Sequence, residues 1–397
     1  MRILLAFDKC KNSLTAAELC SLGEELLRKE KDNVASSIPL TDGGEGFVEI
    51  LTRGAKGIFE QYLVRDSLAR EKLVKVGICK ADSLSETVHR FLDLKGSEKL
   101  AVIEMASVAG LADLKMNERN PWKTSTLGIG DLLGKVSQDG ADAILLGIGG
   151  SSTNDAGLGA LVSLGLRFFD SDGREVANPS PEKWSSIAEV DSKNLSYLPP
   201  LFIACDVENK LLGKKGATYQ FAQQKGLHEK DLPVLEQKME KIVDKLEKFF
   251  PSAKTCADSA GSGAAGGIAF GLSLHYESKL VSGFNLLSHW FDLEKRLMQS
   301  DLVITSEGRF DSTSLNGKGP FELIRLSQKY GKPSLVLAGS VEEKAAHKCE
   351  ELFPDCSIQA FGSEDISLEE NLKHAPELFK TKFKTVLANH LRKTKEK

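Results

Sequence analysis

Apolar runs alternate with polar turns and amphipathic stretches over the first fifty residues of the chain. Residues 3–7 form an apolar run that ends at Asp8. Apolar residues then recur at helical spacing from 15 to 28, where Thr15 and Glu18 have the spacing of a capping box. Residues 37–40 lead into a second polar turn at 41–46, and another apolar-periodic helix begins at Phe47. The repeated order of strand, loop and helix predicts an α/β fold.

The pattern changes in the middle of the chain and returns near its end. Between about 59 and 80, apolar and polar residues alternate, as in half-buried antiparallel strands. Further strands are predicted at 100–105, 143–146, 201–205, 302–304, 334–337 and 358–361, and further helices at 124–136 and 232–249. We therefore expect one α/β domain built from residues 1–58 and 285–397, interrupted by a different, mixed α/β domain of residues 59–284.

Bulk composition narrows the class of protein. The chain has 397 residues, 41% hydrophobic content and a net charge of −4, which gives no reason to expect a nucleic-acid partner. Its seven cysteines are scattered without a CxxC pair, which favours reduced thiols over a disulfide framework or a zinc site. The sequence has no apolar stretch of membrane-spanning length and no signal-like segment at its start. We expect a cytoplasmic protein without a membrane partner.

A glycine-rich segment, GIGGSSTNDAGLG, follows the apolar run 143–146. Gly149 and Gly150 can let backbone N–H groups approach a bound anion, Ser151 adds a hydroxyl, and a following helix would present its N-terminus. Asp155 could cap that helix, hold a metal or take a proton. The alternative is a structural turn capped by Asn154 or Asp155.

Four acid-bearing loops follow strand-like runs. They contain Asp8 with Lys11 and Ser13, Asp42 with Glu45, Asn154 with Asp155, and Glu307, Arg309 and Asp311 with Lys318. One such acid would be read as a helix cap, but four favour a shared site for phosphoryl transfer. That chemistry needs acids to hold Mg²⁺, a base near the attacking hydroxyl and cations on the transferring group. Asp206, which follows its own strand with Lys225 downstream, is a fifth candidate.

The run GSGAAG at 261–266 matches the dinucleotide-binding pattern GxGxxG. No convincing strand precedes the run, and Glu277 follows too closely to be the ribose-binding acid. We interpret it as a closely packed helix start, which can still cradle a phosphate through Gly263 and Gly266. An oxidoreductase that uses NAD is kept as an alternative function.

A series of segments, in order along nearly the whole chain, resembles the bacterial type I glycerate kinase family. The matching segments are 8–14 (DKCKNSL), 39–46 (PLTDGGEG), 103–111 (IEMASVAGL), 120–130, 147–157, 204–213 (ACDVENKLLG), 224–226 (QKG), 261–267 and 305–320 (TSEGRFDSTSLNGKGP). Asn12, Ser306, Thr313 and Ser314 depart from the family pattern inside these loops. The acids, Arg309 and Lys318 are retained.

The resemblance implies ATP- and Mg²⁺-dependent phosphorylation of D-glycerate, giving 2-phosphoglycerate or 3-phosphoglycerate. It also implies that the domain built from both chain ends is Rossmann-like, with the active site in the cleft between the two domains. A homodimer is one assembly to be tested, and a non-catalytic metabolite-binding relative is a further alternative.

Each candidate residue receives an expected role. We expect catalytic roles for Asp8, Lys11, Asp42, Asp155 and Arg309; substrate binding by Ser13, Glu45, Asn154, Asp206 and Asp311; ATP binding by Gly149, Gly150, Ser151, Gly263, Gly266 and Lys318; and metal binding by Asp42 and Glu307.

Overall fold

A computed structural model describes residues 1–29, 33–94, 99–317 and 319–395 of the chain. It contains two compact units: unit 1 comprises Met1–Thr41 and Leu287–Lys397, and unit 2 comprises Asp42–Leu286. The sequence-based boundary at residue 58 is therefore placed too late. Residues 42–58 belong to unit 2 because helix α2 (Phe47–Gly54) packs against strands β4 and β5 of that unit.

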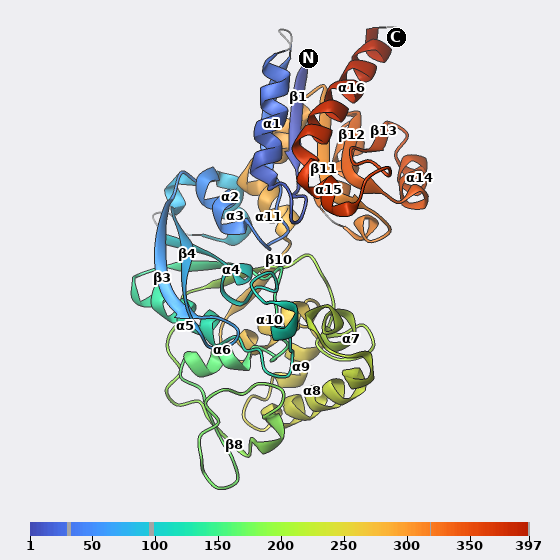
Figure 1. Cartoon of the computed structure of the whole chain (residues 1–397). Helices are drawn as coiled ribbons and strands as arrows, with labels where there is room; N and C mark the ends of the chain where they lie inside the picture. The colour runs from blue at the N-terminus through green and yellow to red at the C-terminus, as the bar shows by residue number, and fades with distance from the viewer. Residues whose placement is uncertain (30–32, 95–98, 318, 396–397) are drawn as a thin grey trace. The chain divides into compact units, whose positions relative to one another are not determined.

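Unit 1 is built on a parallel five-stranded sheet with the strand order β13-β12-β11-β1-β2 (Figure 1). Its strands are β1 (Arg2–Phe7), β2 (Val34–Pro39), β11 (Leu302–Phe310), β12 (Ser334–Val341) and β13 (Cys356–Ala360). Its helices are α1 (Ala16–Arg28), α12 (Leu293–Met298), α13 (Gly319–Lys329), α14 (Glu343–Leu352), α15 (Leu368–Lys373) and α16 (Ala375–Lys395), with the short 3₁₀ turn η7 (Ser314–Asn316).

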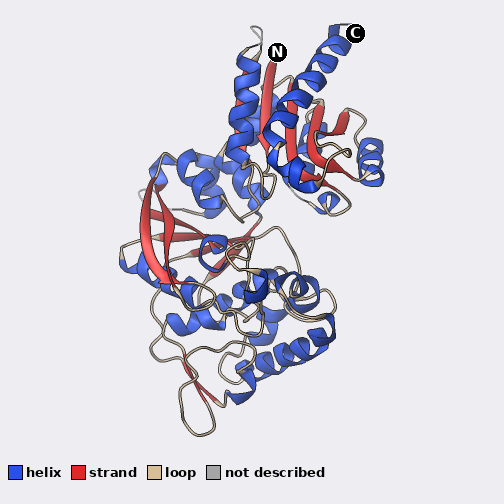
Figure 2. Ribbon diagram, in the orientation of Figure 1, coloured by secondary structure: helices blue, strands red, loops and turns tan. Residues whose placement is uncertain are grey.

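Helices cover both faces of this sheet, as the blue and red layers of Figure 2 show. On one face, Phe7 of β1 packs edge-to-face against Phe379 of α16, in a cluster that also contains Leu19 of α1. On the other face, Phe310 and Val336 pack with α13 and α14. Burial on both faces explains why these strands read as continuous apolar runs.

The order of strands reverses at β1. From β1 the chain first forms β2 on one side and later forms β11 on the other side, and both neighbours run parallel to β1. In open parallel sheets, ligands bind outside the carboxyl ends of the strands at such a reversal. The loops that follow β1 and line β11 are therefore the part of unit 1 that the topology favours for a ligand.

Unit 2 contains a six-stranded mixed sheet with the order β10-β9-β6-β5-β4-β3. Its strands are β3 (Ile58–Arg65), β4 (Glu71–Lys80), β5 (Lys99–Glu104), β6 (Ala143–Gly147), β9 (Leu201–Ala204) and β10 (Ser278–Val281), and a separate antiparallel pair is formed by β7 (Arg167–Phe169) and β8 (Glu189–Asp191). Strands β5, β6, β9 and β10 run parallel, so their carboxyl ends lie along one edge. The antiparallel pair predicted over 59–80 is confirmed as β3 and β4.

The helices of unit 2 are mostly short. They are α2 (Phe47–Gly54), α3 (Glu86–Leu92), α4 (Met105–Ala109), α5 (Leu127–Gln138), α6 (Leu158–Ser163), α7 (Ala217–Phe221), α8 (Leu232–Glu247), α9 (Ala253–Asp258) and α10 (Ile268–Ser273), with the 3₁₀ turns η1 (Ala81–Ser83), η2 (Met116–Glu118), η3 (Trp184–Ser186), η4 (Gln223–Lys225), η5 (Glu229–Asp231) and η6 (Ala264–Gly266). Helix α11 (Gly283–Trp290) carries the chain from unit 2 into unit 1.

Most predicted elements are present, and several differ in extent. Thr15 and Glu18 do form the reciprocal capping box of α1. Strand β11, predicted to end at residue 304, continues to Phe310 because Glu307 and Arg309 remain in register with β12 after the pairing with β1 has ended. Strand β5 ends at Glu104, and Met105 begins α4.

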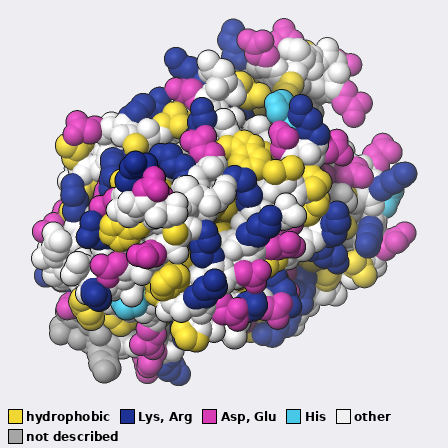
Figure 3. All heavy atoms as spheres, turned by 90° about the horizontal axis from the view of Figure 1, so that it is seen from below, with side chains coloured by type: hydrophobic (Ala, Val, Ile, Leu, Met, Phe, Trp, Pro, Cys, Tyr) yellow, Lys and Arg dark blue, Asp and Glu magenta, His cyan; other side chains and the backbone are white. Residues whose placement is uncertain are grey.

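The charge distribution on the surface and the state of the cysteines can be compared with the predictions from composition. On the face seen in Figure 3, Lys and Arg side chains are interspersed with Asp and Glu. Among the described residues, no helix is both long enough and apolar enough to cross a membrane. All seven cysteines are free thiols.

Candidate functional site

Asp8 lies at the carboxyl end of β1, where the strand order of unit 1 reverses. Its backbone N–H donates to Ser306 O of β11 at 3.0 Å, and Ser306 Oγ donates back to Asp8 O at 3.3 Å. The N–H of Lys9 donates to Asp8 Oδ1 at 2.7 Å. A Cβ on Gly308 would lie only 3.5 Å from the Cα of Cys10, so the loop after β1 lies against β11. These contacts fix the position of the Asp8 carboxylate.

Glu307 is the second carboxylate of this region. It is buried on β11 and accepts a 3.0 Å hydrogen bond from Ser314 Oγ. Burial, together with the negative charges of Asp8 and Glu307, raises the pKa of the Cys10 thiol to about 12. The structure thus brings Asp8 and Glu307 together around a thiol that stays neutral. The sequence did not single out Cys10.

Other predicted residues of unit 1 lie on β11 itself or on the loops that follow β1 and β11. Arg309 is exposed on the extension of β11, and its Nε lies 3.4 Å from Asp311 Oδ2. Asp311 accepts hydrogen bonds from the N–H and hydroxyl of Thr313, one of the residues that depart from the family pattern. Ser13 Oγ donates to Leu372 O at 2.9 Å, so this hydroxyl holds α15.

Lys11 and Lys318 are the remaining cations predicted for this region. Lys11 is exposed in the turn between the bridged residues Cys10 and Leu14. Lys318 lies outside the described residues. The roles of both side chains stay predictions.

Two glycine-rich loops of unit 2 pack directly on one another. The N–H of Gly149 donates to Gly43 O at 3.0 Å, and Gly43 has a positive φ of 82°. A Cβ on Gly149 would lie 2.7 Å from Gly44 Cα, and one on Gly147 would lie 2.4 Å from Gly43 O. Both distances are shorter than real Cβ contacts allow. Several of these glycines are therefore required by loop-on-loop packing, which the sequence could not distinguish from anion binding.

Packing of these loops also positions Asp42 beside Asp206. Asp42 is exposed and accepts a 3.1 Å hydrogen bond from the N–H of Gly44. Asp206 follows β9 and accepts from Ser282 Oγ at 2.9 Å and from the N–H of Phe284 at 3.3 Å. Desolvation raises the pKa of Asp206, and the Asp42 carboxylate raises it further, although the hydrogen bonds oppose this shift. The pair suits proton transfer better than two isolated surface acids would.

Asp155 has a different environment from the one expected for a catalytic acid. Its side chain is 1% exposed. The Oδ2 atom accepts from the N–H and hydroxyl of Thr126 at 2.7 and 2.9 Å, from Ser125 Oγ at 3.3 Å and from the N–H of Gly159 at 3.2 Å. Its Oδ1 atom accepts from the N–H of Gly157 at 3.2 Å. Asp155 therefore ties the starts of α5 and α6 together, as in the capping alternative.

The polar residues of the glycine-rich loop that precede α6 are buried. Burial raises the pKa of Asp155, against the effect of its hydrogen-bond donors. Asn154 is fully buried, and neither its amide nitrogen nor its amide oxygen has a hydrogen-bond partner among the described residues. Ser151 is mostly buried and forms an isolated bridge with Gly110, and Gly150 adopts a φ of 71°. Glu45 is exposed at the other loop.

The GSGAAG run does not have the surroundings of a dinucleotide fingerprint. It follows helix α9 rather than a strand. The N–H of Gly263 donates to Asn209 O at 2.9 Å, and a Cβ on Gly266 would lie 2.0 Å from Thr153 O. Tight packing explains these glycines, so the oxidoreductase alternative is not favoured.

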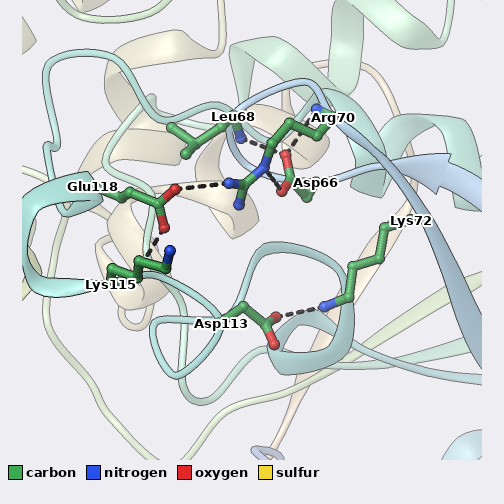
Figure 4. Close-up of polar contacts among 7 residues, drawn as sticks. All are labelled: Asp66, Leu68, Arg70, Lys72, Asp113, Lys115 and Glu118. Atoms are coloured by element: carbon green, nitrogen blue, oxygen red, sulfur yellow. Dashed lines mark hydrogen bonds and ion pairs between the residues drawn. The ribbon is translucent and has the colours of Figure 1, made fainter.

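An ion-pair cluster that sequence reasoning missed holds the β3–β4 turn of unit 2 (Figure 4). Arg70 Nε lies 2.6 Å from Asp66 Oδ2, and Arg70 Nη1 lies 2.8 Å from Glu118 Oε1. Lys72 Nζ lies 2.5 Å from Asp113 Oδ2. Half-exposed pairs of this kind stabilise modestly. Their effect is to fix the turn against the segment that follows α4.

Comparison with known proteins identifies the family. The family model described as the glycerate kinase family matches residues 3–391. The chain is 35% identical over 346 residues to a glycerate kinase of Bacillus subtilis (strain 168), covering 86% of this chain and 85% of that protein. It is 32% identical over 350 residues to a glycerate 2-kinase of Escherichia coli (strain K12), covering 86% of each.

A solved structure is similar over the whole length. A crystal structure from Salmonella typhimurium LT2, provisionally assigned as glycerate kinase 2, superposes with a TM-score of 0.76 and 30% identity, covering 99% of both chains. This similarity, together with the fold of the present chain, defines a two-unit α/β protein of the small-molecule kinase class. The chain belongs to the glycerate kinase family.

Proposed function

We propose that this protein transfers the γ-phosphoryl group of ATP to a hydroxyl of D-glycerate. The observation that carries the proposal is the family match over nearly the whole chain. Acid-bearing loops follow the carboxyl ends of parallel strands in both units. The expectations that the two units share one active site, that the protein is cytoplasmic and that it forms a homodimer stay predictions.

Asp42 and Asp206 are the residues that we assign to the attacking hydroxyl. A carboxylate with a raised pKa is a better proton acceptor near neutral pH than an ordinary one. Desolvation raises the pKa of Asp206 in this way, and the neighbouring charge of Asp42 adds a smaller rise. Asp206 would then accept the hydroxyl proton, with Asp42 in support. This assignment replaces the catalytic role predicted for Asp155, whose carboxylate oxygens accept hydrogen bonds from buried donors.

Cations of unit 1 suit the anionic parts of the substrates. Arg309 is exposed on β11, two residues after Glu307, and Lys11 is exposed in the turn that follows Asp8. A guanidinium can hold a carboxylate or a phosphate in a two-point contact. We assign Arg309 to this role and Lys11 to neutralising charge on the transferring group.

Mg²⁺ would accompany ATP. It is usually held by one or two carboxylates together with substrate phosphates. We assign Asp8 and Glu307, whose charges both raise the pKa of the Cys10 thiol, to this role. When bound, the ion would neutralise phosphate charge. Among the described residues, no group of three or more His, Cys, Asp or Glu side chains forms a metal cluster.

ADP release measured with purified protein, MgATP and D-glycerate tests the proposal. We expect turnover that requires both D-glycerate and Mg²⁺, with L-glycerate and other small hydroxy acids as comparison substrates. A rate that stays at the glycerate-free background with every acceptor would overturn it. Metabolite binding without turnover would favour the non-catalytic alternative.

A further inference from the structure

Lys225 is a lysine in the interior of unit 2. It ends the 3₁₀ turn η4, and its side chain is 2% exposed, which places it among the most completely buried large side chains of the protein. Lysine is almost never fully buried unless it has a partner. The sequence grouped Lys225 with Asp206, which precedes it in the chain. In the structure, Lys225 lies beside the segment 153–155.

The partner of Lys225 is the backbone of the glycine-rich loop. Lys225 Nζ donates a 2.6 Å hydrogen bond to Thr153 O, 72 residues away in sequence. Asp155, two residues further on, is the charged side chain that acts on Lys225. Arg119 lies beside Gly226, but its guanidinium donates from Nε to Leu114 O.

Neighbouring contacts leave one peptide of this loop dependent on Lys225. Ser152 is held by its N–H and hydroxyl, which both donate to Ala109 O at 2.9 Å. On the far side, the N–H of Ala156 donates to Gly266 O at 2.9 Å. Between these anchors lie Thr153, Asn154 and Asp155. The Asp155 carboxylate has its own donors, such as the N–H of Thr126 and of Gly157, whereas the Thr153 carbonyl accepts from Lys225.

Asn154 gives independent evidence that this peptide must be positioned. Its amide is fully buried, and both polar atoms lack a hydrogen-bond partner among the described residues. Buried amides are nearly always satisfied, by protein, water or ligand. A fixed Thr153–Asn154 peptide would hold this amide ready for a ligand group.

We propose that Lys225 is a positioning residue, which fixes the Thr153–Asn154 peptide through its hydrogen bond to Thr153 O and so sets the glycine-rich loop for substrate binding. This inference rests on the proposed kinase function, since substrate binding is its readout.

The pKa of Lys225 allows a second test of its role, through the pH dependence of the loop. Burial lowers the pKa of Lys225 to about 7, and Asp155 partly opposes that shift. With Lys225 buried against Thr153, the protein therefore binds the lysine proton more weakly than it would if this segment opened and exposed the lysine to solvent. These two arrangements of the segment 151–157 are called closed and opened below. As the pH rises from 7 towards the lysine value of 10.5, the closed loop becomes relatively more favourable.

Steady-state kinetics of Lys225→Met tests the proposal, with Lys245→Met as the matched control. Lys245 is a half-buried lysine of α8 that donates to Ile187 O, away from the loop. At a temperature well below unfolding, we expect Lys225→Met to raise KM for at least one substrate about tenfold, with kcat within threefold of wild type. The control should leave both parameters unchanged. Unchanged KM values in a folded Lys225→Met protein would overturn the proposal, as would a fall in kcat and Tm alone.

Hydrogen exchange of the wild-type protein tests the same idea without a variant and without activity. After correction for intrinsic rates, the amides of 151–157 should gain protection between pH 7 and pH 9 relative to those of α8. Equal changes in the two segments would show that Lys225 is not coupled to the loop. A protein without kinase activity that still shows the selective gain would contradict the proposed function but not the role of Lys225 in fixing this segment.

Discussion

The backbone N–H of Thr126 donates a 2.7 Å hydrogen bond to Oδ2 of Asp155, which joins the start of α5 to the loop before α6. Asp155 accepts four further hydrogen bonds, from the hydroxyls of Ser125 and Thr126 and from the N–H groups of Gly157 and Gly159. Asp155, the acid of the glycine-rich segment, thus has the surroundings of a structural hydrogen-bond acceptor. Its removal should affect folding more than chemistry.

Asp155→Asn places an amide NH₂ group among donors and should lower the free energy of unfolding by about 3 kcal/mol. Urea unfolding measures this loss, and Asp172→Asn, at an exposed position, is the control and should change it by less than about 0.5 kcal/mol. The turnover number of the folded Asp155→Asn protein should stay within a few-fold of wild type. A hundredfold loss of kcat with unchanged stability would restore Asp155 as a catalytic residue.

Asp206→Asn removes the proposed proton acceptor while leaving an amide that can occupy the same space. We expect kcat to fall about a hundredfold or more, with little change in Tm. The measurement is the initial rate of ADP release at saturating substrates. Retention of more than a tenth of the wild-type kcat would show that Asp206 does not take the proton.

Asp42→Asn should move the pH profile in a defined direction. Asp206 must be deprotonated to act as a base, so kcat/KM falls as the pH falls through its raised pKa. Removing the negative charge of Asp42 lowers that pKa, and the acid limb should shift to lower pH. A limb that stays in place, or moves to higher pH, would contradict the pairing of these two acids.

Glu307→Gln should raise the Mg²⁺ concentration needed for half-maximal rate, because one of the proposed oxygen ligands loses its charge. The rate measured against free Mg²⁺ at fixed ATP gives this value. Glu342→Gln, at a glutamate that accepts from the N–H of Ser312, is a control from the neighbouring strand end. Equal Mg²⁺ dependence in both variants would remove Glu307 from the metal assignment.

Stability should also depend on pH through Lys225. Its folded pKa of about 7 lies below the unfolded value of 10.5, so the unfolded chain holds the extra proton between these values and stability rises with pH. Between pH 7 and 9, wild type should gain about 2 kcal/mol relative to Lys225→Met. Urea unfolding at the two pH values measures the difference. A constant difference would mean that Lys225 keeps an ordinary pKa.

Much of the fold could be predicted because its signals are local. The capping box at Thr15 and Glu18, the apolar run of β1 and the alternation in β3 and β4 each follow from residues close in sequence. The extension of β11 to Phe310 could not be predicted, since only its register with β12 makes the polar residues Glu307 and Arg309 part of a strand.

The site could be predicted as a set of loops but not as individual roles. Whether an acid is catalytic or structural depends on donors from distant segments, such as Thr126 for Asp155 and Ser282 for Asp206. The burial of Lys225 also depends on contacts 72 residues away. Spacing within one loop contains no information about such partners.

Phosphorus-31 NMR of the reaction with MgATP and D-glycerate is the decisive measurement for a glycerate kinase, because one spectrum reports both turnover and the phosphorylated position. We expect loss of the ATP γ-phosphate signal together with growth of a phosphate-ester signal from 2-phosphoglycerate or 3-phosphoglycerate, which the two authentic compounds distinguish. A spectrum in which ATP stays intact, or in which only inorganic phosphate appears, would contradict it.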